Sequence, residues 1–328
     1  MGTRTRYYLR TIGISSMLHF LVDGLCVCCL YLLVSNGEVT HIVAAFMTYN
    51  VLAFLTQPLT GWVVDRVRRK HWMLLASILL LTLAVLLASL MTSITAWHFS
   101  SFCLMVAATL LGMGNSLFHV WGGKEAVLKT DNDIRALGIF VSTGAFGLSV
   151  GIVFHSWGLL FMFLLAICLL ALAYVHLDSA LEGKEGTQTQ GVRHAAFSRL
   201  AVFAAMAALV AFVLFRSFIG QSFTAGVDRG ASVILALGAV SMLGKMAGGW
   251  LAKDMGIVRT LVFVLLATLA CLAFRTSGTV ALLTGLFMIN CTMPITLYLA
   301  NVVLKGREGL AFGLLAAALM PGYLLAFL

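Results

Sequence analysis

The chain has 328 residues, of which 61% are hydrophobic and only 10% are charged, with a formal net charge of +9. A soluble domain of this length could not bury so much apolar surface and would carry roughly twice as much charge, so the composition excludes a soluble protein. The apolar residues form continuous runs of about twenty, the length an α-helix needs to cross a hydrocarbon core roughly 30 Å thick. We therefore expect an all-α, polytopic membrane protein.

The first apolar run, residues 12–34, follows the basic segment TRTRYYLR and could be mistaken for a secretory signal. It contains His19 and Asp23, however, and no small-residue cleavage site ends it, so we interpret it as an uncleaved first span. Reading the later runs in the same way predicts about eleven transmembrane helices. The predicted spans cover residues 12–34, 40–63, 71–92, 97–119, 136–154, 157–177, 197–222, 231–252, 258–274, 278–302 and 309–328.

The Lys and Arg residues, 21 in total, gather mainly on one side of the membrane in this topology. Because cytoplasmic loops carry the excess of Lys and Arg in membrane proteins, we expect this side, with the N-terminus, to be cytoplasmic. The positive net charge is thus explained by the orientation of the chain in the cell (cytoplasmic or inner) membrane, and no nucleic-acid partner is expected. The basic side comprises the N-terminal tail and the loops near residues 64–70, 120–135, 178–199, 253–259 and 303–308.

Two charged clusters in otherwise apolar surroundings are similar to each other. GWVVDRVRRK, residues 61–70, lies in the predicted turn between the second and third spans, and GGWLAKDMG, residues 248–256, ends the eighth span. A Gly-Trp pair with charged neighbours that recurs about half a chain apart suggests two structural repeats. The polar segment between them predicts a cytoplasmic linker at 178–196, a six-helix N-terminal bundle at 1–177 and a five-helix C-terminal bundle at 197–328.

The pattern from Gly61 through Asp65 and Arg66, followed by basic residues, resembles the signature loop of the major facilitator superfamily, and the half-chain repeat and linker are similar to that family too. Four further stretches look most like its fosmidomycin-resistance-type efflux proteins. The resemblance implies two pseudo-symmetric helical bundles that carry a solute by alternating access. The chain departs from the family pattern at Lys253, which aligns with Asp65. It also ends after the eleventh predicted span where the family has twelve, so we expect either that the twelfth span is absent or that the sequence is incomplete. The four stretches are HFLVDG (19–24), YNVLAFLTQPLTGWVVD (49–65), GMGNSLFH (112–119) and LFRSF (214–218).

Asp23 is the first candidate functional residue, because it lies near the middle of the first predicted span. An ionisable side chain within lipid costs about 2.5–3.5 kcal/mol on insertion scales, so it needs a reason. His19 precedes Asp23 by one helical turn on the same face. Such a pair can take up and release a proton when the hydration of its site changes. The alternative is a neutral Asp23 that only hydrogen-bonds between helices.

Arg216 lies on the seventh predicted span, the repeat counterpart of the first. The family resemblance implies that the first helix of each half lines a central cavity, so we expect Asp23 and Arg216 to face each other or a shared anionic substrate. A guanidinium binds phosphonate or carboxylate oxygens through its planar fork. The alternative is that Arg216 extends to the outer membrane surface.

Four further polar residues are candidate cavity residues, each with a structural alternative. Lys245 in the eighth span could equally extend to the inner surface. His119 ends GMGNSLFH, which the resemblance marks as a signature histidine, or it is simply interfacial. Asn50 and Gln57 in the second span either line the cavity or form interhelical hydrogen bonds.

The charged turn after the second span is a candidate cytoplasmic gate. Its basic residues could serve topology alone, but the resemblance implies that this loop latches the two halves together. Physically, Asp65 could sit against the positive N-terminal end of a helix from the other half, while the Arg residues pair with acids. The expected gate residues are Gly61, Asp65, Arg66, Arg69, Lys70 and, in the repeat copy, Asp254.

No catalytic or metal site is expected. Gly147-x-Ser149-x-Gly151 matches the hydrolase elbow pattern, but an elbow needs a strand-turn-helix context that a lipid-buried helix does not provide. Small residues at this spacing more often let two helices approach closely. All seven cysteines lie in apolar runs and are interpreted as small buried hydrophobes, so no cofactor is expected.

We therefore expect a monomeric secondary active transporter that moves a small polar or amphiphilic solute, and whose partners are that solute, protons and lipid. Its most specific version is proton-coupled efflux of a drug or antibiotic. An uptake carrier for an anionic metabolite and a non-transporting membrane scaffold remain alternatives. A polar cavity between the halves, lined by Asp23 and Arg216, would favour a transporter over a scaffold.

Overall fold

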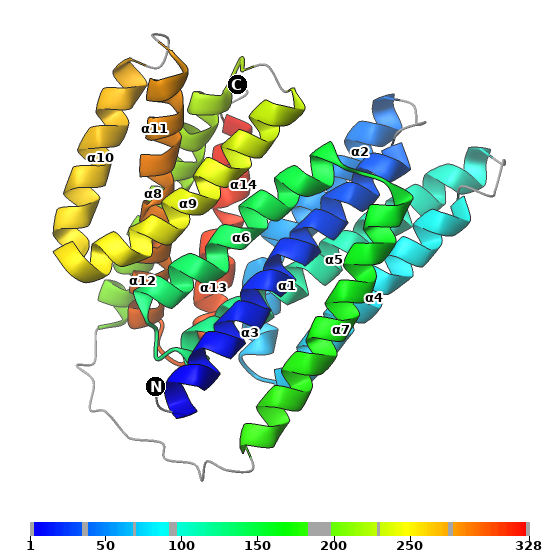
Figure 1. The fold of residues 1–328 in the computed structure, drawn as a ribbon, viewed down its shortest axis with the longest axis horizontal. Helices are drawn as coiled ribbons and strands as arrows, with labels where there is room; N and C mark the ends of the chain where they lie inside the picture. The colour runs from blue at the N-terminus through cyan, green and yellow to red at the C-terminus, as the bar shows by residue number, and fades with distance from the viewer. Residues whose placement is uncertain are drawn as a thin grey trace.

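The computed structural model describes residues 3–34, 39–67, 70–91, 97–182, 198–227, 230–274 and 278–325. Within these ranges the regular structure is entirely helical, so the expected all-α class is confirmed. Figure 1 shows long helices arranged in two groups, with α1, α2, α4, α5 and α7 in one and α8, α10 and α11 in the other. Helices α6 and α9 pack against each other where the two groups meet.

The helices follow the predicted spans closely. The first half comprises α1 (Thr3–Val34), α2 (Val39–Asn50), the π-helix η1 (Val51–Leu55), α3 (Gln57–Val64), α4 (Lys70–Met91), α5 (Trp97–Lys129), α6 (Ile134–Val153) and α7 (Trp157–Glu182). The second half comprises α8 (Arg199–Thr224), α9 (Ala231–Met255), α10 (Ile257–Ala273), α11 (Thr279–Asn290), α12 (Thr292–Val303), α13 (Glu308–Ala317) and α14 (Leu319–Leu325).

Within the described ranges, eight helices are long and apolar enough to cross a membrane, or nine if a bent pair counts as one span. That pair, His41–Leu55 and Gln57–Val64, bends by 41°. Two shorter apolar helices, Ile257–Ala273 and Glu308–Gly322, correspond to the ninth and eleventh predicted spans. Every predicted span is therefore helical in the structure.

Three predicted spans are interrupted, and prolines account for the interruptions. The chain has three prolines. Pro58, Pro294 and Pro321 lie in the first turn of α3, α12 and α14, just after the break in each span. Proline has no N–H to donate and its ring crowds the carbonyl four residues earlier, so a helix bends or breaks there.

Each group of helices has its own apolar core, and a third cluster joins them. One buried cluster includes Leu25, Leu81 and Leu111 from α1, α4 and α5, and a second is built around Phe223 and Ile289 of α8 and α11. The joining cluster brings together side chains from α5, α6, α8, α12 and α13, among them Phe140, Val213, Leu297 and Phe312. The fold is thus two helical bundles packed along an apolar seam.

The segment expected to link the bundles begins as helix. Helix α7 continues to Glu182, and Asp178, the first residue of the expected linker, is only 2% exposed. Residues 183–197 lie outside the described residues. The boundaries of the two bundles near residues 177 and 197 stay a prediction.

Glycines let α6 lie directly against its neighbours. A Cβ atom at Gly147 would collide with the carbonyl oxygen of Phe20, and one at Gly151 with that of Gly24, both on α1. On its other side, Ser149 of α6 packs onto Gly238 of α9. The interpretation of this segment as a helix-packing surface is therefore confirmed, and its likeness to a hydrolase elbow is coincidental.

The outer faces of the bundles are apolar. Leu79, Leu83 and Leu90 of α4 are all more than two-fifths exposed, as are Leu165 and Leu172 of α7. Exposed apolar rows of this extent on long helices are the surface that lipid covers in a membrane protein.

Candidate functional site

A carboxylate held between two histidines lies inside the first bundle. His19 and Asp23 are one turn apart on α1, and Asn115 and His119 are one turn apart on α5. His19 Nε2 lies 3.3 Å from Asp23 Oδ2, and His119 Nε2 lies 3.3 Å from Asp23 Oδ1. The two Nε2 atoms are 3.0 Å apart, and Asn115 Nδ2 donates to Asp23 Oδ1 at 3.2 Å. We call His19, Asp23 and His119 the His-Asp-His cluster.

Backbone carbonyls fix which ring nitrogens carry hydrogen. His19 Nδ1 is 2.7 Å from the carbonyl oxygen of Phe140, and His119 Nδ1 is 3.0 Å from that of Asn115. A carbonyl oxygen can only accept, so both Nδ1 atoms donate and the Nε2 atoms bear the lone pairs of the neutral rings. Two nitrogen lone pairs and a carboxylate then converge. Such a group is stable only with a proton or another cation among its members.

The cluster is almost wholly removed from solvent. His19 is 4% exposed and Asp23 7% exposed, and the aromatic rings of Phe118 and Phe140 lie against His19. Gly144 lets α6 pack directly against the cluster, because a Cβ atom there would collide with Asp23 Oδ2 and His19. The candidate proton site therefore depends on three helices, α1, α5 and α6.

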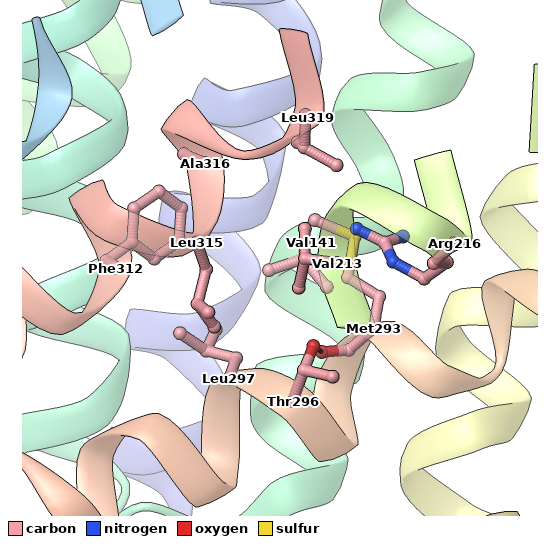
Figure 2. A pocket seen from close by; sticks show the side chains of 10 residues that line it. All are labelled: Val141, Val213, Arg216, Met293, Thr296, Leu297, Phe312, Leu315, Ala316 and Leu319. Carbon is pink, nitrogen blue, oxygen red and sulfur yellow. Dashed lines mark hydrogen bonds between the residues drawn. The ribbon is translucent and has the colours of Figure 1, made fainter. Parts of the chain in front are cut away.

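Arg216 of α8 lines a small cavity at the seam between the bundles. Its side chain is buried, at 6% exposed, and its Nε atom has no hydrogen-bond partner among the described residues. Figure 2 shows its guanidinium extending into the cavity, with Phe312, Leu297 and Leu315 on the opposite side. The cavity volume of about 30 Å³ is enough for one or two water molecules, not a larger solute. The remaining lining residues are Val141, Val213, Met293, Thr296, Ala316 and Leu319.

Asp23 does not line this cavity, and no ion pair joins it to Arg216 among the described residues. The expectation that the two residues face each other directly is wrong for this conformation, and its alternative, that they face a shared anionic substrate, stays a prediction. The physical reason is the intervening α6: His19 is hydrogen-bonded to Phe140, whose neighbour Val141 lines the cavity. The ring centroids of Phe140 and Phe312 are 6.4 Å apart, so a wall of aromatic and aliphatic groups separates the two sites.

Lys245 of α9 lies near both the His-Asp-His cluster and Arg216. It is half-buried, and it is close enough to Arg216 and Asp23 for both charges to act on it. Its own charge acts on His119. The region between the bundles therefore holds two cationic side chains, Arg216 and Lys245, neither of which is paired with an acid among the described residues.

Asn50 and Gln57 do not line the described cavity. Asn50 Nδ2 donates to the carbonyl oxygen of Phe46, and Gln57 Nε2 donates to that of Ala53, each one turn earlier in the same span. Gln57 is fully buried, and its backbone carbonyl packs onto Gly313 of α13. The side-chain amides of both residues thus bond within their own span, and not between helices as their structural alternative expected.

Asp65 lies against the N-terminal end of α13 in the other bundle. Its Oδ1 accepts from Gly309 N and its Oδ2 from Leu310 N, both at 2.9 Å. The first N–H groups of a helix have no intrahelical partner and carry a partial positive charge, so an ionised carboxylate is well placed there. Lys124 Nζ also lies 3.2 Å from Asp65 Oδ1. Gly61 makes the approach possible, because a Cβ atom there would collide with Gly309.

Among the described residues, neither Arg66 nor Asp254 forms a hydrogen bond or ion pair with the other bundle. Arg66 is exposed, stacks 3.6 Å above the ring of Trp62 and donates to the carbonyl oxygen of Trp62, and no acid pairs with it among the described residues. The indole face of Trp62 offers this cation a nearby partner. Asp254 is exposed. Arg69 lies outside the described residues, as does the side chain of Lys70 at the start of α4.

The repeat copy builds a second contact of the same shape. Gly249 of α9 packs onto the carbonyl of Ile134 in the first turn of α6, as Gly61 packs onto α13. One turn earlier, the carbonyl of Lys245 faces Gly138, as that of Gln57 faces Gly313. The two contacts between the bundles are therefore related by the internal repeat.

The charges at this second contact are arranged differently. Asp133 is the N-cap of α6: its Oδ1 accepts from Arg135 N at 2.9 Å, and its Oδ2 accepts from Arg135 Nη2 at 2.8 Å. Burial alone would raise the pKa of Asp133, but the hydrogen bonds and charge of Arg135, together with the charge of Lys253, lower it below its ordinary value. Arg135 also lies 5.4 Å over the ring of Trp250.

Sequence reasoning missed several of these residues. Asn115 lies one turn before His119 in GMGNSLFH, so helical spacing could have signalled that both would face Asp23. Lys124 lies in the last part of α5 and Asp133 just before α6, and only the tertiary structure shows the partner of Lys124. A partly buried network of Lys129, Asp178 and His71 also lies beyond any local sequence signal.

Comparison with known proteins places this geometry in context. Over residues 10–327 the sequence matches the Major Facilitator Superfamily, whereas a search of curated proteins finds no match. The structure is similar to the E. coli fucose:proton symporter, with a TM-score of 0.65, 12% identity and coverage of 98% of this chain and 90% of that one. It is equally similar to a bacterial homologue of the iron transporter ferroportin in an outward-facing state, with a TM-score of 0.65, 12% identity and coverage of 100% and 91%. The chain therefore belongs to the Major Facilitator Superfamily and is a secondary transporter rather than an enzyme.

Proposed function

We propose that the chain is a proton-coupled transporter that exports a small amphiphilic solute carrying an anionic group, by alternating access between its two bundles. The single observation that carries the proposal is the His-Asp-His cluster. It is a carboxylate buried between two imidazoles on different helices, beside the seam where the bundles meet.

The cluster has the composition of a proton site. With both Nδ1 atoms facing carbonyls, the groups that remain to bind a proton are two Nε2 atoms and one carboxylate within 3.3 Å of one another. A proton bound there is held in the dry state and released when water reaches the charged groups. Ionisable groups buried in membrane helices commonly belong to such relays.

The neighbouring cavity suggests the chemistry of the solute. Arg216 offers a guanidinium whose Nε has no hydrogen-bond partner among the described residues, and the rest of the lining is mainly aliphatic and aromatic. A guanidinium binds carboxylate or phosphonate oxygens, and the apolar wall favours a hydrophobic body on the same molecule. The small volume indicates that the bundles must separate before such a solute can enter.

The contacts between bundles support an alternating-access cycle. On the side of Asp65, α3 packs against α13, whereas α2, the other half of the same span, makes its main contacts with α1, η1 and α5 of its own bundle. We propose that this conformation is closed at the cytoplasmic side, with the N-terminus and the basic loops in the cytoplasm.

The direction of transport follows from the sequence resemblance. The four stretches similar to fosmidomycin-resistance-type proteins favour efflux of a drug or antibiotic from the cell. Uptake of an anionic metabolite is the second candidate, because the unpaired Arg216 binds an anion equally well in either direction.

The test is solute flux in proteoliposomes under an imposed proton gradient, with a panel of phosphonates, amphiphilic carboxylates and antibiotics. Asp23→Asn keeps the shape of the side chain but removes its charge, so we expect it to abolish gradient-driven flux and to leave gradient-independent solute exchange intact. The matched control is Asp254→Asn, an exposed aspartate outside the cluster. Gradient-driven flux that is unchanged in Asp23→Asn would refute the coupling role. Flux of no tested solute through the wild-type protein would favour the scaffold alternative.

A further inference from the structure

We infer that the His-Asp-His cluster is also a binding site for one divalent first-row transition-metal ion, such as Zn²⁺ or Co²⁺. The metal site itself does not depend on the proposed transport function. Because the same groups would bind the ion and the coupling proton, we expect each to exclude the other, and this consequence does rest on the proposed function.

The spacing of the three ligand atoms fits a metal ion. The Nε2 atoms of His19 and His119 are 3.0 Å apart, and each lies 3.3 Å from an oxygen of Asp23. Three corners of a tetrahedron with metal–ligand bonds of about 2.0–2.1 Å are about 3.3 Å apart. One ion can therefore reach both imidazoles and the carboxylate with little movement of α1 or α5.

The surroundings of the ligands fit as well. Imidazoles that bind a metal generally donate their other N–H to a backbone carbonyl or carboxylate, which directs the lone pair at the ion. Both rings do so here, to the carbonyls of Phe140 and Asn115. The side chain of Asn115 donates to Asp23 and so fixes the carboxylate. Imidazole and carboxylate ligands suit Zn²⁺, Co²⁺, Ni²⁺ and Fe²⁺ better than the larger Ca²⁺.

Gly144 lets α6 pack directly against two of the ligand residues. A Cβ atom on this residue would collide with both Asp23 Oδ2 and His19 Nε2, two of the three ligand atoms. A methyl group at this position would therefore displace these ligand atoms while leaving all three ligand residues in the chain.

The test uses purified full-length protein in detergent, freed of metal with a chelator. Titration with Co²⁺, followed by its visible absorption, and equilibrium dialysis with Zn²⁺ should each show one ion per chain. We expect His119→Gln to weaken binding by more than about tenfold, since neighbours that merely orient a ligand already contribute about 10–100-fold. The matched control is His155→Gln, because His155 is an exposed histidine between α6 and α7; it should bind as the wild type does.

A second variant guards against a folding defect. Gly144→Ala retains every ligand and should also lose binding, with thermal unfolding showing whether each variant is folded. Absence of binding to the wild-type protein, or equal binding by wild type and a folded His119→Gln variant, would overturn the inference. Metal binding is measured without a proton gradient and proton-driven flux with a chelator present, so either proposal can fail while the other stands.

Discussion

The two glycine contacts between the bundles, at Gly61 and at Gly249, have the same backbone geometry and different charges. At the first contact, Gly61 brings α3 onto α13, and Asp65 crosses between the bundles to accept two backbone N–H groups. At the second, Gly249 brings α9 onto α6, but the residue aligned with Asp65 is Lys253. The acid at this contact is Asp133, which caps its own helix.

Comparing the two contacts separates the features that both share from those found at only one of them. Close approach through a glycine is common to both contacts, because a Cβ atom at either position would collide with the facing backbone. The carboxylate at the helix N-terminus is also common, but only Asp65 is supplied by the opposite bundle. When the bundles separate, Asp65 must give up its hydrogen bonds, whereas Asp133 keeps those with Arg135. We therefore expect the first contact to act as the stronger latch.

The largest expected effect comes from Asp65→Ala. The change leaves two N–H groups of α13 and the charge of Lys124 without their partner, and losing one side of a buried, charge-assisted interaction typically costs about 2–3 kcal/mol. We expect a shift of roughly 30- to 150-fold towards the state open to the cytoplasm. A Val64→Cys reporter, buried in this contact, should become correspondingly more reactive to an impermeant maleimide applied from the cytoplasmic side.

The matched control for that change is Asp254→Ala, which removes an exposed acid from the repeat copy. Equal labelling of the reporter in the Asp65→Ala and Asp254→Ala proteins would break the comparison, because it would show that a carboxylate crossing between bundles does not hold them.

A smaller effect is expected from Asp133→Ala. Loss of an N-cap costs about 0.5–2 kcal/mol, so thermal unfolding in detergent should occur at a lower temperature, with little change in labelling of the Val64→Cys reporter. Because its pKa is lowered, Asp133 contributes this stability above about pH 4, the ordinary range of an aspartate, and loses it as the pH falls through its lowered value. The difference between wild type and variant should therefore persist at neutral pH and disappear only in acid. A variant that opens the gate as strongly as Asp65→Ala would contradict the assignment of Asp133 to its own helix.

The smallest effect is expected from Lys253→Ala. Lys253 is exposed and acts on Asp133 only through charge, and exposed pairs of this kind contribute about 0–1 kcal/mol. Both the reporter labelling and the unfolding temperature should stay close to those of the wild type. A large gating defect would mean that the two halves latch symmetrically after all.

Much of the fold could be predicted because its signals are local. Runs of apolar residues give the helices, and the loop from Gly61 to Asp65 indicates a contact with a helix N-terminus, which the structure contains. The positions of Pro58 and Pro294 could have predicted the broken spans as well, since the effect of proline acts within one turn.

The candidate site was harder to predict because it depends on how helices are rotated against one another. Depth in the membrane can be estimated from helical rise, but rise does not say which face of α1 or α8 points at a neighbour. The family resemblance led us to expect that Asp23 and Arg216 would meet, yet Phe140 and Val141 of α6 lie between their sites. Besides His19 on its own helix, Asp23 contacts His119 and Asn115 of a different helix, α5.

The bend in the second span has a consequence for how the protein can move. Its inner part, α3, is fastened to the opposite bundle through Gly61 and Asp65, while its outer part, α2, belongs with α1 and α5. Between them, the π-turn at Val51–Leu55 and Pro58 interrupt the regular hydrogen-bond ladder, so flexing there disturbs fewer bonds than flexing an unbroken helix. We therefore expect α3 to be able to move away from α13 while α2 keeps its contacts with α1 and α5. Opening at one end of the transport pathway then need not be rigidly coupled to closing at the other.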